Sequence, residues 1–224
     1  MSDEARPQQP LPGLITSITV QTRNKERYSV FVDEEFLLGV NEQTLIKFNL
    51  SKGVEVTPRL YKKIQREEGR FAVKKYLLKL LGRRDHARRE LLTKALRKDY
   101  TREVIIDVLD ELEEKGYIDD AGFARKYAAD QYRLNKWGPA KIKAHLFKKG
   151  IGRTVAEQSI REAFKNEDLE ETFIHLVGKR KRHFLKEEHL LKRKKKIIRY
   201  LAGKGYRSSS IYRSIDKLMK VIEQ

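Results

Sequence analysis

Residues 138–155 read GPAKIKAHLFKKGIGRTV, and this stretch contains the start, the buried face and the end of one helix. Gly138-Pro139 is a helix-start signal, because proline fits the first helical turn, where its missing N–H is not needed. Ile142 and Leu146 are four residues apart and therefore share one helix face. Gly150 follows at the point where a helix C-cap favours a positive φ. The stretch predicts a helix, a tight stop and a second helix.

The same pattern occurs three times, with a period of about 50 residues. In each copy, two apolar residues four apart precede a stop residue, an apolar residue and a new helix. The other two copies are Leu91, Ala95, Asp99, Tyr100 and Val104, and Ile197, Leu201, Gly205, Tyr206 and Ile211. Asp99 replaces glycine in the first copy, although aspartate adopts a positive φ less easily than glycine. Repetition at a fixed period is typical of a helical-repeat array.

The order of the units follows from helix-start and helix-stop residues. Thr57-Pro58 starts the helical part, with threonine as N-cap and proline at the first helical position. We expect a flexible tail over residues 1–13, a small β-rich module over 14–57, a linking helix over 58–71, and three-helix repeats over 72–120, 121–168 and 169–224. The predicted fold class is therefore mainly α, with tandem three-helix repeats after a small N-terminal β-hairpin-containing module.

Residues 14–57 are rich in β-branched and aromatic side chains, unlike the rest of the chain. Leu14–Thr22 and Tyr28–Val32 have the composition of extended strands. The polar residues 23–26 lie between them, so the two segments predict a β-hairpin. Phe36–Val40 predicts a third strand on the same grounds.

The charge of the chain is the main sequence evidence about its partners. Fifty Lys and Arg residues against 32 Asp and Glu residues give 224 residues a formal net charge of +18. Such a surface attracts polyanions over roughly 10 Å at ordinary salt, which favours nucleic acid, an acidic protein surface or an anionic membrane. Cysteine is absent, so disulfides and cysteine-ligated metals are excluded. No apolar run has membrane-spanning length, and we expect a cytoplasmic protein, or a nuclear one if the source has a nucleus.

Basic residues of the second and third repeats are candidates for contacts with a filament or with DNA. Long Lys and Arg side chains reach phosphates and carboxylates, although any single one is often only a solvated surface residue. In a compact protein, the positive charges within each of the two dense runs, 179–182 and 192–196, repel one another, which favours an anionic partner. The candidates are Lys136, Lys141, Lys148, Lys149, Arg153, Lys179, Arg180, Lys181, Arg182, Lys192, Arg193, Lys194, Lys195 and Lys196.

The sequence contains no pattern typical of catalysis or of metal binding. Its five histidines form no HExxH motif and no i,i+4 pair. Asp119-Asp120 is better explained as a helix start than as a metal site, because adjacent side chains point in different directions. Trp137 either packs between helices or stacks on a partner. We therefore expect no catalytic residues, no metal and no cofactor.

Another set of residues resembles the RecX family of bacterial regulatory proteins. Residues 108–120 read VLDELEEKGYIDD and are followed by Phe123-Ala124 and Tyr127, which is similar to the signature of that family. The resemblance continues through Gly138, Lys141-Ile142, Leu146 and Lys149-Gly150-Ile151, and upstream through Ala72, Tyr76-Leu77, Leu80-Leu81, Arg88 and Glu90-Leu91. It covers residues 58–224, and residues 14–57 are similar to a β-containing extension of some members. It departs at Asp99, where glycine is usual, and at Asp85-His86-Ala87, where serine is common.

The resemblance implies an elongated, curved array that binds the RecA recombinase in the groove of its filament on single-stranded DNA. It also implies slower filament growth, ATP hydrolysis and strand exchange, damped self-cleavage of repressors in the SOS response, and no catalytic residues. We therefore expect a monomeric inhibitor of RecA in recombinational DNA repair. Single-stranded and double-stranded DNA are expected as further partners, and a membrane is not. The alternatives are a sequence-independent DNA-binding or architectural protein, which would share the charge, and a nucleic-acid enzyme.

Overall fold

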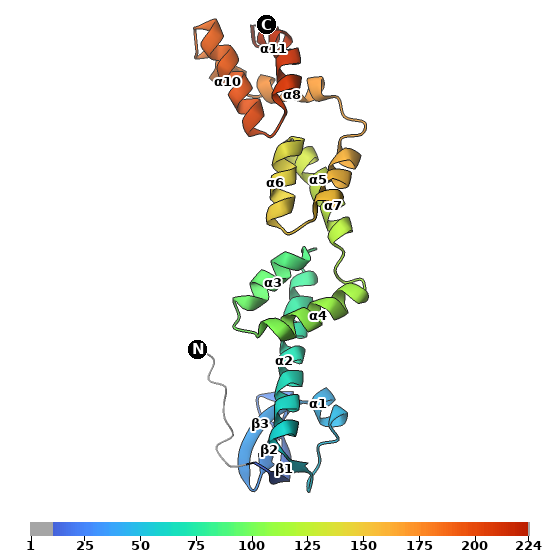
Figure 1. Cartoon of the computed structure of the whole chain (residues 1–224). Helices are drawn as coiled ribbons and strands as arrows, with labels where there is room; N and C mark the ends of the chain where they lie inside the picture. Colours follow the sequence, from blue (N-terminus) through green and yellow to red (C-terminus); the bar gives the residue numbers. More distant parts are fainter. Residues whose placement is uncertain (1–10, 224) are drawn as a thin grey trace. The chain divides into compact units, whose positions relative to one another are not determined.

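The computed structural model describes residues 11–223, which form eleven helices and one four-stranded sheet (Figure 1). The predicted fold class, a mainly helical chain with a small N-terminal β module, is confirmed. Residues 1–10 of the predicted tail lie outside the described residues, and Gly13 already belongs to the first strand. The chain divides into two compact units. Each unit consists of two segments of the chain. Unit 1 consists of the residues up to Arg84 together with Leu91–Ile118. Unit 2 consists of Asp85–Glu90 together with the residues from Asp119 onward.

The N-terminal module is an antiparallel sheet with the strand order β3-β2-β1-β4. The strands are β1 (Gly13–Gln21), β2 (Asn24–Val32), β3 (Glu35–Asn41) and β4 (Glu55–Val56). The predicted turn over residues 23–26 is wrong in length, because Gln21 pairs with Asn24 and only two residues connect β1 to β2. Asp33 and Glu34 form the next turn with φ of 48° and 68°. Positive φ at both turn positions matches the twist of a two-residue hairpin.

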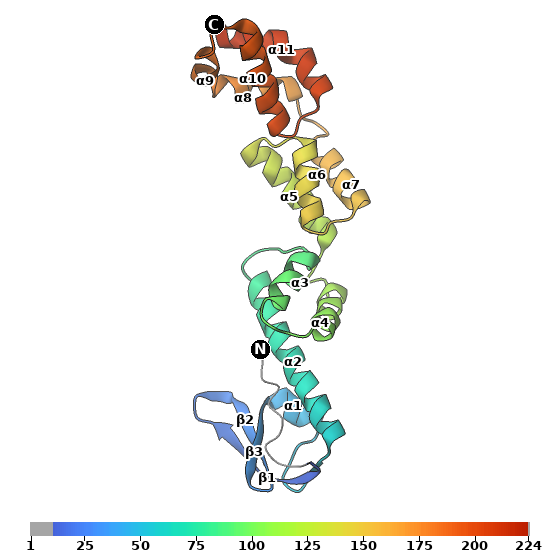
Figure 2. The ribbon, with the colours of Figure 1, turned by 60° about the vertical axis from the view of Figure 1, so that its left-hand side comes forward.

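Helix α2 (Pro58–Leu81) contributes to both hydrophobic cores of unit 1. Its first half contributes Tyr61 and Ile64 to the core of the sheet. Its second half contributes Val73 and Leu77 to a core shared with α3 (Arg88–Leu96) and α4 (Arg102–Glu114). The predicted boundary between a linking helix and a first repeat at residue 71 therefore falls inside one continuous helix (Figure 2).

Unit 2 contains the second and third repeats. The second repeat consists of α5 (Asp120–Asn135), α6 (Pro139–Lys148) and α7 (Arg153–Ala163). The third consists of α8 (Leu169–Gly178), α9 (Lys181–Leu185), α10 (Leu190–Gly203) and α11 (Ser208–Glu223). The third repeat thus has a short additional helix, α9, where three helices were predicted. Phe184 anchors α9, because its ring is buried in the core of this repeat.

The residues that defined the repeat have the predicted roles. The paired apolar residues are fully buried, including Ile142 and Leu146 in α6. The stop residues adopt positive φ, with 89° at Gly150, 96° at Gly205 and 58° at Asp99. Each helix therefore ends where the sequence pattern places its stop, including the copy in which aspartate replaces glycine.

Main-chain atoms join the second and third repeats inside unit 2. The N–H of Gly138 donates to the carbonyl of Lys204 at 2.7 Å, and the N–H of Ala140 donates to the carbonyl of Gly205 at 3.0 Å. A Cβ atom at Gly138 would lie 2.5 Å from the carbonyl carbon of Gly205. Only glycine permits this approach, so the start of α6 is fixed against the end of α10.

Candidate functional site

All fourteen predicted basic candidates lie in unit 2, but the structure gives them different environments. Four of them form internal ion pairs, namely Lys149 with Glu90, Arg153 with Glu157, Arg193 with Glu223 and Lys194 with Asp216. The other ten form no salt bridge with any residue of 11–223. The structure therefore separates cations that hold the fold from cations whose charge is not balanced locally.

Lys149 has an internal structural contact. Its Nζ donates to Glu90 Oε1 at 2.7 Å, and both side chains are about four-fifths buried. The same ammonium lies 5.4 Å from the centre of the Phe123 ring and 5.2 Å from that of Tyr127. A cation between a carboxylate and two aromatic rings stabilises the packing of unit 2 and is poorly placed to meet a partner.

The second basic run contains both kinds of residue. Arg193 is buried, with its Nε donating to the carbonyl of Glu187 at 2.9 Å and its Nη1 lying 3.3 Å from Glu223 Oε1. Lys194 donates to Asp216 at 2.6 Å. Lys192 and Lys195 are exposed, so the part of this run that can reach a partner is smaller than its sequence suggests.

A basic pocket of about 340 Å³ lies where the second and third repeats meet. Three of the predicted residues line it: Lys136, Lys179 and Arg180. The complete lining is Arg133, Leu134, Asn135, Lys136, His175, Leu176, Lys179, Arg180, Tyr200 and Lys204. Five of these side chains are Lys or Arg and none is Asp or Glu. We call this cavity the basic pocket.

The structure holds the cations of the basic pocket close together, and four of the five form no salt bridge with a carboxylate of residues 11–223. Lys204 Nζ donates to the carbonyl of Asn135 at 3.0 Å, which keeps its ammonium at the pocket wall. Burial lowers the pKa of Lys204, and the nearby cations Lys141, Arg180 and Lys179 lower it further. The fifth cation, Arg133, forms a salt bridge with Asp130 at 3.2 Å. The pocket is thus a site where positive charges repel one another and where an anion would relieve the repulsion.

Aromatic side chains support this arrangement. The guanidinium of Arg180 lies 4.9 Å from the centre of the Tyr200 ring, and Lys204 Nζ lies 6.0 Å from it. The hydroxyl of Tyr206 donates to the carbonyl of Lys136 at 3.0 Å, and burial raises the pKa of Tyr206. The backbone of Lys136, which adopts a left-handed φ of 49°, is therefore held by a neutral hydroxyl while its side chain lines the pocket.

Sequence reasoning missed Arg133, Tyr200 and Lys204 as pocket residues. A local signal for Lys204 was available, since a lysine precedes the stop residue in each copy, as Lys98, Lys149 and Lys204. A cation at a helix C-terminus is favoured by the helix dipole, so this pattern also has an ordinary structural explanation. Nothing in the sequence shows that the ends of α5, α8 and α10 meet.

The remaining candidates lie outside the pocket lining. Lys148, Arg182, Lys192 and Lys195 are exposed, and Lys181 and Lys196 are half-buried. Lys141 lies over the Trp137 ring at 4.5 Å, and the same ring is 4.5 Å from that of His145. Trp137 therefore packs within the second repeat, as the first of the two interpretations expected.

Within residues 11–223, no three His, Cys, Asp or Glu side chains gather in a way that could hold a metal ion. Over the same residues, no helix has the length and apolar character needed to span a membrane.

Comparison with known proteins identifies the family. A family model described as the regulatory protein RecX N-terminal domain matches residues 13–57, and one described as the RecX second three-helix domain matches residues 119–160. The regulatory protein RecX of Listeria monocytogenes serotype 4a is 32% identical over 197 residues, which cover 87% of this chain and 71% of that protein. The chain belongs to the RecX family.

Other RecX proteins match this chain over most of its length, and a solved RecX structure has the same fold. The regulatory protein RecX of Clostridium tetani is 30% identical over 207 residues, covering 92% of this chain and 94% of the relative. A crystal structure of regulatory protein RecX aligns with a TM-score of 0.75 at 26% identity, covering 92% of this chain and 99% of that one. The RecX relatives are named as regulatory proteins rather than as enzymes.

Proposed function

We propose that this chain binds the RecA recombinase filament on single-stranded DNA and inhibits its growth, its ATP hydrolysis and its strand exchange. The protein acts in the cytoplasm as a monomer, and it modulates recombinational repair by binding rather than by catalysis. Membership of the RecX family supports a regulatory role. The resemblance described above supplies the recombinase as the partner.

The basic pocket is the observation that carries the proposal furthest. Lys136, Lys179, Arg180 and Lys204 converge on one cavity, and none of them forms a salt bridge within residues 11–223. A nucleoprotein filament presents both DNA phosphates and acidic protein side chains, and either can neutralise this group. Charge-assisted contacts of this kind are about twice as strong as neutral hydrogen bonds, and they weaken as salt rises.

The main-chain hydrogen bonds between the second and third repeats explain how binding would inhibit the filament. Gly138 and Gly205 fix the second and third repeats relative to each other, so their cations reach a partner at a constant spacing. Once one repeat is bound, the other meets its target at a high effective concentration. Binding across neighbouring parts of a filament in this way would oppose the movements that accompany ATP turnover.

Titration of the protein into the cognate recombinase on single-stranded DNA, with ATP hydrolysis as the readout, tests the proposal. Hydrolysis should fall at amounts of protein far below those that saturate the DNA. If hydrolysis falls only when the DNA is coated, the chain is a sequence-independent DNA-binding protein instead. Metal-dependent turnover of nucleic acid by the purified protein would favour the enzyme alternative.

A charge reversal assigns the effect to the basic pocket. The double variant Lys179→Glu/Arg180→Glu should raise the concentration for half-inhibition by about 10-fold or more, because two exposed cations of the pocket become repulsive. The matched control is Arg207→Glu/Arg213→Glu, which changes the net charge equally at exposed residues outside the pocket. Equal losses in the two variants would show that net charge alone is responsible.

A further inference from the structure

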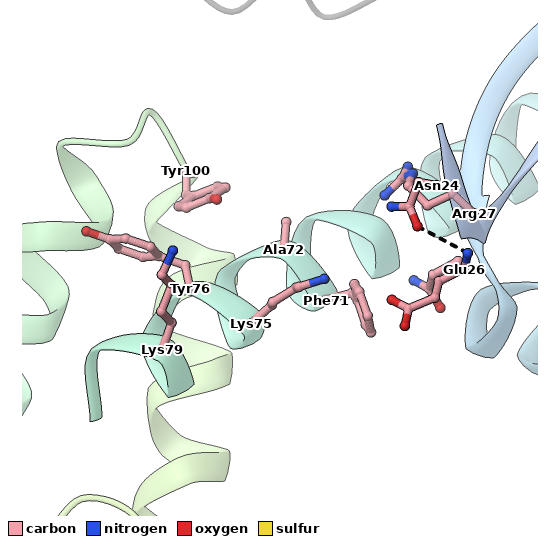
Figure 3. A pocket seen from close by; sticks show the side chains of 10 residues that line it. Asn24, Glu26, Arg27, Phe71, Ala72, Lys75, Tyr76, Lys79 and Tyr100 are labelled. Atoms are coloured by element: carbon pink, nitrogen blue, oxygen red, sulfur yellow. Dashed lines mark hydrogen bonds between the residues drawn. The ribbon is translucent and has the colours of Figure 1, made fainter. Parts of the chain in front are cut away.

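Unit 1 contains a second pocket, of about 300 Å³, beside helix α2. It is lined by Asn24, Glu26, Arg27, Asn41, Phe71, Ala72, Lys75, Tyr76, Lys79 and Tyr100. In Figure 3, Tyr76 and Tyr100 lie near each other at one end of this pocket, and Asn24, Glu26 and Arg27 lie at the other. We call it the aromatic pocket, because three of its ten side chains are aromatic.

The aromatic side chains present ring surface to the cavity. The centres of the Tyr76 and Tyr100 rings are 6.2 Å apart, and the ring planes are inclined by 49°. The two rings are therefore not stacked face to face, and both are half-buried. Tyr76 and Tyr100 also pack against the core shared by α2, α3 and α4, whereas Phe71, which is half-buried too, belongs to neither hydrophobic core of the described part of unit 1. An aromatic ring that serves no core and lines a cavity is suited to contact a ligand.

Two lysines stand on the same side of α2 as Phe71. Lys75 and Lys79 follow it at successive intervals of four residues, so the three side chains lie along one helix face. Both lysines are exposed, and neither forms a salt bridge with another residue between 11 and 223. The pocket therefore combines flat apolar surface with the cations Lys75 and Lys79 on α2, and with one carboxylate, that of Glu26, on the hairpin.

Hydrogen bonds and a salt bridge hold the opposite wall in place. Arg27 donates to the carbonyl of Gly39 at 2.7 Å and lies 3.2 Å from Glu68 Oε2. Glu68 Oε1 accepts hydrogen bonds from the Asn41 N–H at 2.8 Å, the Asn41 side-chain amide at 2.7 Å and the Thr44 hydroxyl at 2.7 Å. This network holds the hairpin strands against α2, so the pocket is a preformed cavity.

We propose that the aromatic pocket binds one nucleotide of a single-stranded nucleic acid. The base lies against the rings of Tyr76 and Tyr100, and the adjoining phosphates lie next to Lys75 and Lys79. Aromatic rings beside cations are the usual combination for single strands, because every base has a stacking face and every linkage has a charge. An acidic peptide would satisfy the lysines but would have no flat group for the rings. The cavity is at the lower end of ligand-pocket volumes, which suits a single nucleotide.

This proposal gives the N-terminal β module a role of its own, because the hairpin forms one wall of the site. It does not depend on the recombinase, and it concerns a cavity separate from the basic pocket in unit 2. It is therefore tested with nucleic acid alone.

The test uses the full chain and fluorescence anisotropy with two labelled probes, an oligothymidylate and an abasic oligonucleotide of the same length. Both probes carry the same phosphates, so only the first offers bases for stacking. The wild-type protein should bind the oligothymidylate about 5- to 10-fold more tightly. The variant Tyr100→Leu should bring that ratio close to one. Equal affinity of the wild-type protein for both probes would overturn the proposal.

Charge variants of α2 test the phosphate side of the site. Lys75→Glu/Lys79→Glu should weaken oligothymidylate binding by about 10-fold. The control Lys62→Glu/Lys63→Glu makes the same change of charge at exposed residues of the same helix outside the pocket, and its effect should stay within about 2- to 3-fold. All four residues are exposed, so both variants should keep the thermal stability of the wild type. Equal losses in the two variants would overturn the assignment of the phosphates to this pocket.

Photocross-linking identifies the position of the base directly. An oligonucleotide with 5-iodouracil should cross-link to Tyr76 or Tyr100, and mass spectrometry of the peptides would show it. Cross-links confined to unit 2, or complete competition by polyglutamate without any base preference, would overturn the proposal in favour of the basic pocket or of an acidic protein partner. Base preference without inhibition of the recombinase would refute the proposed function alone, and inhibition without base preference would refute this inference alone.

Discussion

Glu111 on α4 forms salt bridges with three basic residues of unit 1, and its replacement tests the electrostatic part of the fold. Its Oε1 accepts hydrogen bonds from Lys115 Nζ at 2.6 Å and from Lys74 Nζ at 2.7 Å. Its Oε2 lies 3.0 Å from Arg70 Nη2. Arg70 and Lys74 belong to α2, so one carboxylate joins the two helices. The variant Glu111→Gln should destabilise unit 1.

The magnitude follows from the pKa of this carboxyl. The hydrogen bonds from Lys115 and Lys74 lower the pKa of Glu111 from 4.5 to about 2. A shift of this size corresponds to at most about 3 kcal/mol at neutral pH. The Glu111 side chain is 20% exposed and that of Lys115 is 52% exposed, so solvent screening reduces the effect. We expect a loss of about 1–2 kcal/mol in the free energy of unfolding.

The dependence on pH has a definite sign. Because the folded-state pKa is lower than the unfolded-state value, the carboxylate stabilises the fold above pH 4.5 and loses this effect as pH falls towards about 2. The difference in stability between the wild type and Glu111→Gln should therefore be largest at neutral pH and shrink between pH 4.5 and 2.

Urea denaturation at several pH values, followed by far-UV circular dichroism, measures this difference. Trp137, the only tryptophan, lies in unit 2, so its fluorescence does not report on unit 1 directly. Glu114→Gln is the matched control, because Glu114 is an exposed glutamate of the same helix that forms no salt bridge within residues 11–223. Its effect should stay within about 0.5 kcal/mol. A loss in Glu111→Gln that is the same at every pH would refute the electrostatic reasoning.

Three further predictions concern the repeats and the second basic run. Gly138→Ala should destabilise unit 2 by about 2–4 kcal/mol, because a Cβ would displace the facing main chain and break two hydrogen bonds; Trp137 fluorescence in urea measures this, and an unchanged midpoint would contradict the described junction. Asp99→Gly should stabilise unit 1 by about 0.5–1 kcal/mol, because glycine adopts a φ of 58° without strain; a lower thermal midpoint would show that the aspartate makes a compensating contact. Lys192→Glu/Lys195→Glu should weaken inhibition of recombinase ATP hydrolysis and reduce its sensitivity to salt; unchanged inhibition would remove this run from the mechanism.

Local signals account for the parts of the fold that the sequence predicted. Apolar residues four apart, such as Ile142 and Leu146, share a helix face whatever surrounds them, and both are buried. Gly150 and Gly205 were expected to end helices with a positive φ, and they do. Local polarity was a poorer guide at the first hairpin. Residues 23–26 suit both a turn and an exposed strand, so the strand that begins at Asn24 could not be distinguished from a longer turn.

The basic pocket depends on contacts between distant segments. Its lining comes from residues 133–136, 175–180 and 200–204, which meet only because the second and third repeats are joined. The sequence showed the charge of Lys179 and Arg180 but not their neighbours. It also could not show that Arg193 has internal partners, because those partners, Glu187 and Glu223, are six and thirty residues away. The number of basic residues can be read from the composition, whereas tertiary structure decides which of them can bind a partner.

At the junction between the second and third repeats, two lysines use their backbone and their side chain for different contacts. Lys136 and Lys204 each contribute a carbonyl to the contacts that hold the repeats together, while their side chains line the basic pocket. A main-chain carbonyl accepts a hydrogen bond whatever side chain its own residue carries. Substitutions of Lys136 can therefore change the charge of the pocket while the described hydrogen bonds of the junction are kept, whereas substitution of Lys204 also removes the bond from its Nζ to the Asn135 carbonyl. A series of Lys136 variants would thus give proteins with one architecture and a stepwise range of affinities.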